Sequence, residues 1–103
     1  MVKTLNEQEF YQAIYQGSWV VEFWSDSCGP CKAVAPALEH LSHEFQTTHF
    51  GKVNVDQEIA LALQQQVLGV PTVIIYKDGM PHDFLYSLYS VNEYRERIKS
   101  ALG

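Results

Sequence analysis

The feature that most constrains the fold of this chain is a strand, a helix and a second strand in close succession. Residues 19–24 (WVVEFW) form a short apolar run between turn-forming residues, which is typical of a strand covered on both faces. Apolar residues then recur at helical spacing over residues 31–46, and residues 50–55 predict the second strand. Such a βαβ unit requires parallel strands and a right-handed crossover.

Three further helices are predicted from their N-terminal signals. Asn6 with Glu9 has the spacing of a capping box before the first strand, and Ser90 with Glu93 repeats this pattern near the C-terminus. Asp56 is predicted to cap a short helix after the second strand. The apolar residues of that short helix are Ile59, Ala62 and Leu63.

A hairpin is predicted between the last two helices. Residues 72–77 are rich in β-branched side chains, and Asp78-Gly79 is a strong signal for a tight turn into an antiparallel return strand. The return strand is expected to place Phe84, Tyr86 and Leu88 on one face and Leu85, Ser87 and Tyr89 on the other. The predicted fold is therefore α/β, with a central mixed β-sheet flanked by helices on both faces.

Length and charge exclude several classes of protein. A chain of 103 residues fits one domain, expected to span residues 1–103 and to be monomeric. The net charge of −5, without a cluster of Lys or Arg, argues against nucleic acid or an anionic membrane as the main partner. No apolar run approaches the length of a membrane span, and no signal peptide is visible in the first residues.

The chain has only two cysteines, Cys28 and Cys31, and they point to chemistry rather than to a structural staple. A bridge across two residues closes too short a loop to stabilise much, but it allows a compact turn with both sulfurs in reach. The N-terminus of the following helix favours a thiolate on Cys28, and Pro30 suits the start of that helix. We expect Cys28 to be exposed and activated and Cys31 to be shielded.

Other roles for the pair remain as alternatives: a structural disulfide, inert core cysteines or a zinc site. Zinc requires four ligands, and the nearest histidine pair, His40 and His43, follows on the same predicted helix. At a rise of ~1.5 Å per residue, His40 lies roughly 13 Å beyond Cys31, too far for shared coordination. We therefore expect surface histidines and no metal or other cofactor beyond the cysteine pair.

Glu22 is the only charged residue of the first predicted strand. If both faces of that strand are covered, the carboxyl group is desolvated, and its affinity for a proton rises. This favours a proton acceptor beneath the dithiol, with Lys52 on the neighbouring strand as its charge partner. The alternatives are an edge strand whose Glu22 faces water, and a Lys52 that is simply exposed.

Taken together, these motifs resemble the thioredoxin family over essentially the whole chain. A Cys-x-x-Cys motif on its own is weak evidence for a family. Here Gly29-Pro30 lies between the cysteines, and further motifs follow at the expected spacing along the chain. The matching segments are Val21-Glu22-Phe23-Trp24, Cys28-Gly29-Pro30-Cys31-Lys32, Ala35-Pro36, Val53-Asn54-Val55-Asp56, Gly69-Val70-Pro71-Thr72 and Lys77-Asp78-Gly79.

The resemblance implies a role for each site residue. Cys28 would be the attacking nucleophile and Cys31 the resolving thiol, while Glu22 and Lys52 would occupy the places of the family's buried Asp and its lysine neighbour. Pro71 would be a cis proline beside the disulfide, with an ordinary trans turn as the alternative. The backbone of Val70 would pair with the substrate chain, and the other substrate contacts are expected at Trp24, Gly29, Pro30 and Pro71.

The expected function is reduction of protein disulfides by dithiol–disulfide exchange in the cytoplasm, with a thioredoxin reductase as electron donor. Three positions depart from the family pattern: Ser27 replaces a Trp, Glu22 replaces an Asp, and Ser87 aligns with a Gly of the substrate groove. These departures motivate an alternative, a partner-restricted reductase or a disulfide isomerase. A non-catalytic interaction module or metal carrier on the same fold is a further alternative.

Overall fold

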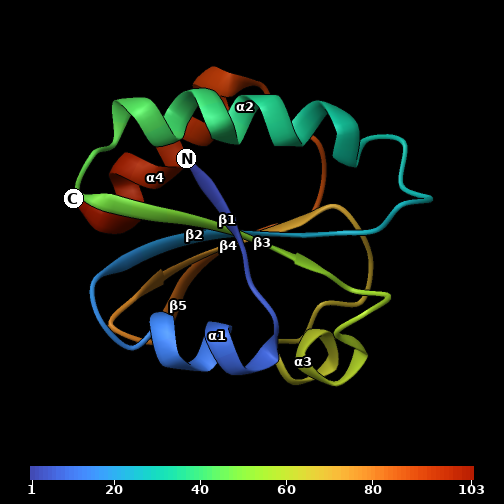
Figure 1. The fold of residues 1–103 in the computed structure, drawn as a ribbon. Coiled ribbons are helices and arrows are strands. Elements are labelled where there is room, and N and C mark those ends of the chain that lie inside the picture. Colours follow the sequence, from blue (N-terminus) through green and yellow to red (C-terminus); the bar gives the residue numbers. More distant parts are fainter.

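A five-stranded sheet crosses the middle of the structure, which is a computed structural model describing residues 1–103 (Figure 1). The strands are β1 (Val2–Thr4), β2 (Ser18–Trp24), β3 (Thr48–Asn54), β4 (Thr72–Lys77) and β5 (Met80–Leu85). The helices are α1 (Glu7–Ala13), α2 (Cys31–Glu44), α3 (Ile59–Gln64) and α4 (Val91–Leu102). The predicted α/β class is confirmed.

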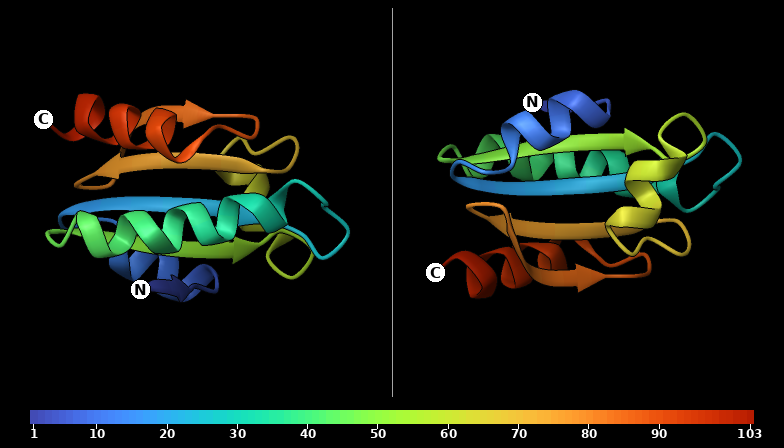
Figure 2. Two further views of the ribbon diagram at one scale, coloured as in Figure 1. Left: turned by 90° about the horizontal axis from the view of Figure 1, so that it is seen from above. Right: turned by 90° about the horizontal axis from the view of Figure 1, so that it is seen from below.

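The strand order is β1-β3-β2-β4-β5, so β2 lies at the centre of the sheet. β3 runs parallel to both β1 and β2, whereas β4 is antiparallel to β2 and β5 is antiparallel to β4. Helices α2 and α4 cover one face of this mixed sheet, and α1 and α3 cover the other (Figure 2). None of the helices has the length and apolar character needed to cross a membrane.

The side chains of β2 alternate between the two cores, and this alternation determines where Glu22 points. Val21 and Phe23 belong to the cluster beneath α1 and α3, whereas Val20 belongs to the cluster beneath α2 and α4. Because successive side chains of a strand face opposite ways, Glu22 points toward α2. The edge-strand alternative for Glu22 is wrong, since its neighbours are Lys52 on β3 and Val73 on β4.

Both predicted capping boxes are present, but the predicted cap of the short helix is wrong. Glu58, not Asp56, occupies the N-cap position of α3, and its side chain makes no capping hydrogen bond. The Asp56 amide instead donates to Oδ1 of Asn54 at 2.9 Å. The chain therefore turns locally after β3, and the helix starts later than its polar residues suggest.

The apolar residues of α3 do not all face the core. Leu61 and Ala62 are buried in the core, whereas Ile59 and Leu63 are 62% and 64% exposed. Residues four apart share one face of a helix, so Ile59 and Leu63 emerge together on the outer side. The short helix thus presents an apolar face to solvent.

The return strand is shorter than predicted, and one strand was missed. β5 ends at Leu85, opposite Val73, so the residues from Tyr86 to Tyr89 lie in a loop and do not alternate between two faces. β1 is only three residues long and pairs at the edge of the sheet with β3. A segment this short carries too few residues for its periodicity to be read.

Candidate active site

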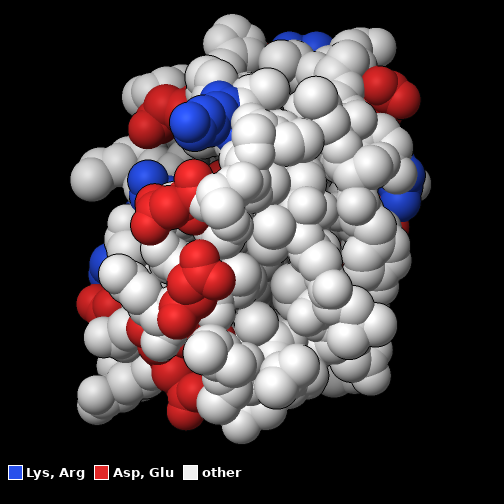
Figure 3. Space-filling model, turned by 90° about the vertical axis from the view of Figure 1, so that its right-hand side faces the viewer, with Lys and Arg blue, Asp and Glu red and all other residues white.

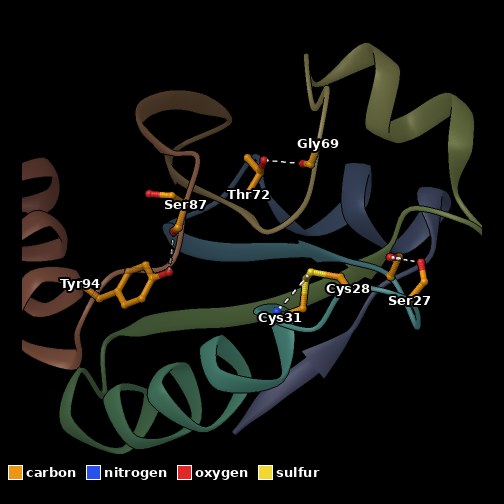
Figure 4. The surroundings of a disulfide bond; sticks show 8 residues. Ser27, Cys28, Cys31, Gly69, Thr72, Ser87 and Tyr94 are labelled. Carbon is orange, nitrogen blue, oxygen red and sulfur yellow. Dashed lines mark hydrogen bonds between the residues drawn. A yellow bond between two sulfur atoms is a disulfide. The ribbon is translucent and has the colours of Figure 1, made fainter.

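The two cysteines lie where central strand β2 ends and helix α2 begins. They form a disulfide with their Cα atoms 5.4 Å apart (Figure 4). Pro30 stands at the N-cap position with helical backbone angles (φ −59°, ψ −27°), so Cys31 becomes the first residue of the helix. The Cys28 amide donates to the carbonyl oxygen of Ser25 at 3.2 Å, which holds the preceding turn.

The two cysteines differ in hydrogen bonding rather than in exposure. Cys28 is 7% exposed and Cys31 is 4% exposed, so the expected exposed Cys28 is wrong for the disulfide form. The Cys31 amide donates to Sγ of Cys28 at 3.2 Å. This amide belongs to the positive end of the helix dipole and stabilises negative charge on the Cys28 sulfur.

A pocket of about 180 Å³ lies on the Cys31 side of the disulfide. Its lining residues are Glu22, Trp24, Ser25, Asp26, Cys31, Lys32, Ala35 and Lys52. Cys28 is not among them. The sheet and the helix therefore bring the predicted carboxyl group and Cys31 to the same pocket.

Glu22 is the most unusual ionisable group of this pocket. It is 2% exposed, and its Oε2 atom has no hydrogen-bond partner. Burial raises the pKa of Glu22 to about 7, and the positive charge of Lys52 opposes this rise. A carboxyl group with this pKa exchanges its proton near neutral pH, as general acid–base chemistry requires.

Lys52 and Trp24 complete the pocket wall. Lys52 is half-buried and forms no ion pair with Glu22, so the predicted charge partner acts through space. Its Nζ lies 5.7 Å from the ring centre of Trp24, as in a cation–π contact. Trp24, predicted to contact substrate, thus lines the Glu22 pocket.

On the other side of the pair, residues 69–71 form a loop in which the backbone of Val70 is free. The Val70–Pro71 peptide bond is cis, as the resemblance implied. The Val70 amide and carbonyl groups take part in none of the backbone hydrogen bonds outside the helices and strands. The Thr72 hydroxyl donates to the carbonyl oxygen of Gly69 at 2.8 Å and anchors the loop near the disulfide (Figure 4).

The remaining predicted residues lie on the surface around the pair. Gly29 and Pro30 are exposed, and open space surrounds the position that a Cβ atom on Gly29 would take. Ser27 is exposed, with its hydroxyl 3.3 Å from that of Ser25. Ser87 is also exposed, and its carbonyl oxygen accepts the Tyr94 hydroxyl at 3.3 Å (Figure 4).

His40 and His43 are surface residues on α2, as predicted. Their Nε2 atoms lie 3.9 Å and 3.5 Å from carboxylate oxygens of Glu44 and Glu39. The structure contains no group of three or more His, Cys, Asp or Glu side chains arranged to hold a metal ion.

Several residues of the pocket wall were not predicted from the sequence. Ala35 follows Cys31 by four residues, so helical periodicity places it one turn further along the same face. Ser25, at the end of β2, carries no such signal. Its position beside the disulfide arises from the turn that the chain makes after the strand.

Comparison with known proteins gives a consistent result. The family model described as Thioredoxin matches residues 1–100. A thioredoxin of Chlamydia caviae is 39% identical over 88 residues, which cover 85% of this chain and 86% of that protein. A thioredoxin of Staphylococcus aureus is 35% identical over 80 residues, or 77% of each chain.

Solved structures agree with these sequence matches. The thioredoxin of Fasciola hepatica superposes with a TM-score of 0.89 at 31% identity, covering 97% of this chain and 99% of that one. A mutant thioredoxin from Halobacterium salinarum NRC-1 gives a TM-score of 0.90 at 25% identity, covering 98% of this chain and 90% of that one.

Proposed function

The chain belongs to the thioredoxin family and is a thiol–disulfide oxidoreductase, and on this premise we propose that Cys28 and Cys31 reduce disulfide bonds in other proteins. Family members work through their own cysteine pair without a cofactor. The observation that carries the division of roles is the asymmetry of the pair. The sulfur of Cys28 accepts an amide of the helix N-terminus, and Cys31 faces the buried Glu22.

The proposed reaction has two exchange steps. The Cys28 thiolate first attacks one sulfur of the substrate disulfide, which forms a mixed disulfide and expels the other substrate sulfur as a thiolate. Cys31 then loses its proton and attacks Sγ of Cys28, so that the internal disulfide forms and the second substrate thiolate leaves. Two electrons pass to the substrate, whose two thiolates take up protons.

Glu22 is proposed as the acceptor of the Cys31 proton, directly or through water. Three observations support this role: the shared pocket, the burial of the carboxyl group and its pKa of about 7. In this scheme Lys52 acts through Glu22. Its positive charge lowers the pKa of the Glu22 carboxyl group, although the two side chains form no ion pair.

Substrate binding is proposed on the opposite side of the disulfide. The free amide and carbonyl groups of Val70 suit the addition of a short substrate strand, beside Pro71. Gly29 and Pro30 form the exposed margin over which the substrate approaches. Trp24 is proposed to contact the substrate from the Glu22 pocket, which it lines.

The direction of exchange is proposed to be reductive, in the cytoplasm, with a thioredoxin reductase as electron donor. Gly29-Pro30 between the cysteines supports this direction. Measurement of the reduction potential checks it, because a value below roughly −220 mV fits a cytoplasmic reductant and one near roughly −120 mV fits an oxidant.

The decisive experiment is a trap for the mixed disulfide. Cys31→Ser is expected to accumulate covalent complexes with disulfide-bearing proteins, because the attack on Cys28 that releases the substrate is lost. Cys28→Ser is the matched control and should form none. Failure of Cys31→Ser to form any complex would contradict the proposed function.

A further inference from the structure

Helix α3 leads into the loop whose backbone is proposed to pair with substrate, and the junction between them has an uncommon backbone conformation. Gln66, which follows the end of the helix, has a positive φ of 63°. Its amide donates to the carbonyl oxygen of Leu63 at 3.1 Å, and the Val67 amide donates to the carbonyl oxygen of Ala62 at 2.9 Å. These two bonds form a Schellman motif, in which the residue with positive φ is usually glycine.

The left-handed conformation of Gln66 is unfavourable for a residue with a side chain. A left-handed backbone brings the Cβ atom close to the following carbonyl oxygen, which glycine avoids because it has no Cβ atom. Such a conformation persists only where the surrounding structure holds it in place. The end of α3 therefore needs contacts that stabilise this turn.

A chain of hydrogen bonds provides these contacts through the side chain of Gln65. The Tyr76 hydroxyl donates to Oε1 of Gln65 at 2.8 Å, and Nε2 of Gln65 donates to the Tyr11 hydroxyl at 3.2 Å. The Tyr11 hydroxyl in turn donates to Oε1 of Gln64. This arrangement, the Gln65 clamp, joins β4, α1 and the last turn of α3.

Tyr76 is the rigid member of the Gln65 clamp. Its side chain is fully buried in the core beneath α1 and α3, where its ring packs edge-on against that of Phe10 with 5.5 Å between the ring centres. Burial raises the pKa of the Tyr76 hydroxyl, so the group stays protonated and remains a donor. The amide of Gln65 is thus held with its oxygen toward β4 and its nitrogen toward α1.

The loop beyond Val67 has few hydrogen bonds of its own. Within residues 68–70, the only backbone group in a hydrogen bond is the carbonyl oxygen of Gly69, which accepts the Thr72 hydroxyl at 2.8 Å. These residues belong to no helix or strand. The position of the Val70 backbone is therefore determined by the two ends of the loop, which are β4 and the turn after α3.

This loop lies on a surface with little charge. Figure 1 shows it at the right-hand end of the molecule, and Figure 3 faces this end and shows a broad uncharged area with acidic side chains along its left margin. Asp56 is the only charged residue that lines the hollow between α3 and the loop. A substrate segment here must therefore form its directional bonds with the backbone of the loop.

We propose that Gln65 is a positioning residue, which fixes the backbone of Val70 for substrate binding. Tyr76 and Tyr11 hold the side chain of Gln65, and the Gln65 clamp stabilises the left-handed turn that directs the loop toward the disulfide (Figure 4). Gln65 itself does not line the hollow beside the loop. This inference rests on the proposed disulfide reduction and adds a residue that acts on binding through the loop.

The test compares two disulfides that differ in their need for Val70. Insulin presents a peptide backbone, whereas hydroxyethyl disulfide has no peptide group to pair with the loop. Tyr76→Phe removes one partner of Gln65, so the second-order rate constant for insulin should fall about fivefold, with less than about a 1.5-fold change for hydroxyethyl disulfide. Single-turnover oxidation of the reduced protein measures both rate constants.

A second substitution tests the role of the turn. Because glycine adopts a positive φ without strain, Gln66→Gly in the Tyr76→Phe background should restore the insulin rate constant to within about twofold of wild type. Hydrogen exchange at the Val67 amide reports the same turn. Exchange should be faster in Tyr76→Phe and should slow again in the double variant.

Tyr11→Phe and Tyr15→Phe complete the set of variants. Tyr11→Phe removes the other partner of Gln65 without changing the buried core, and it should lower the insulin rate constant by about threefold. Tyr15→Phe is the matched control, because Tyr15 is 60% exposed and its hydroxyl forms no hydrogen bond. It should behave as wild type with both disulfides.

Three results would overturn the inference. Both clamp variants would keep the wild-type ratio of the two rate constants, both disulfides would lose rate equally, or Gln66→Gly would fail to restore the insulin rate. An equal loss would mean that the Gln65 clamp acts on the dithiol rather than on the loop. Failure of the wild type to reduce either disulfide would instead contradict the proposed function itself.

Discussion

The two sides of the Cys28–Cys31 disulfide differ in the residues that surround them: charged side chains line one side and apolar side chains the other. On the Cys31 side, a pocket holds the buried carboxyl group of Glu22, and Lys52 lines the same pocket. On the Cys28 side, the surface is largely apolar, with an unpaired backbone at Val70 and a hollow lined by Val55, Ile59 and Leu63 beyond it.

In the proposed mechanism, this difference separates the proton transfer at Glu22 from the binding of the substrate protein. Burial raises the pKa of the Glu22 carboxyl group to about 7, because water is excluded from it. A partner protein can be bound only on a surface that is open before it arrives. Placing the two requirements on opposite sides of one disulfide lets a single short loop satisfy both.

The largest expected difference lies between the two thiols of the reduced protein. At pH 7 we expect iodoacetamide to modify Cys28 at least about 100-fold faster than Cys31, because only the Cys28 sulfur receives the helix amide. The single variants Cys28→Ser and Cys31→Ser allow each rate to be measured by mass spectrometry. Equal modification rates would show that the two cysteines do not differ in thiolate reactivity.

The next effect concerns stability and its dependence on pH. Burial raises the pKa of Glu22 from 4.5 to about 7, so the folded state binds this proton more tightly than the unfolded state. The stability that this proton contributes is complete below pH 4.5 and is lost as the pH rises through 7. The loss amounts to about 3 kcal/mol.

Glu22→Gln removes this titration, so its stability relative to wild type should rise by about 3 kcal/mol between acid and mildly alkaline pH. Urea unfolding of the disulfide forms at several pH values measures the change. Glu96→Gln makes the same chemical change on an exposed side chain of α4 and should leave the profile as in wild type. A flat difference between Glu22→Gln and wild type would show that the carboxyl group is not desolvated.

A smaller effect is expected on the second exchange step. If Glu22 accepts the Cys31 proton, Glu22→Gln should slow resolution of the mixed disulfide about tenfold at pH 8, with general-base catalysis lost. Below the pKa of about 7 the wild-type carboxyl is protonated, and the two rates should converge. Rapid-quench release of a fluorescent peptide measures the step, and an unchanged rate would leave Glu22 a structural role only.

The smallest expected effect is that of Lys52, whose charge acts on Glu22 without an ion pair. Lys52→Met removes the positive charge that lowers the pKa of Glu22, so the pH profile of resolution should move to higher pH. The plateau rate at high pH should change by less than about threefold, because Lys52 makes no ion pair with Glu22. A fall in the plateau with no shift of the profile would mean that Lys52 acts by another route.

Much of the fold follows from local patterns in the sequence. The Asn6–Glu9 and Ser90–Glu93 capping boxes and the Asp78-Gly79 turn depend on residues close together in the chain. Such local patterns are reliable because their hydrogen bonds join residues that are already close together along the chain. The prediction failed where tertiary packing decided the outcome, as for the start of α3, which depends on how the helix docks against the core.

The site divides in the same way. The sequence alone determined that Cys28 and Cys31 lie together at a strand–helix junction, because spacing along the chain is enough for that. Only the tertiary structure placed β2 in the middle of the sheet and so desolvated Glu22. It also brought the loop before Pro71 beside Ser25, since strand order and loop contacts arise from pairing between segments far apart in the chain.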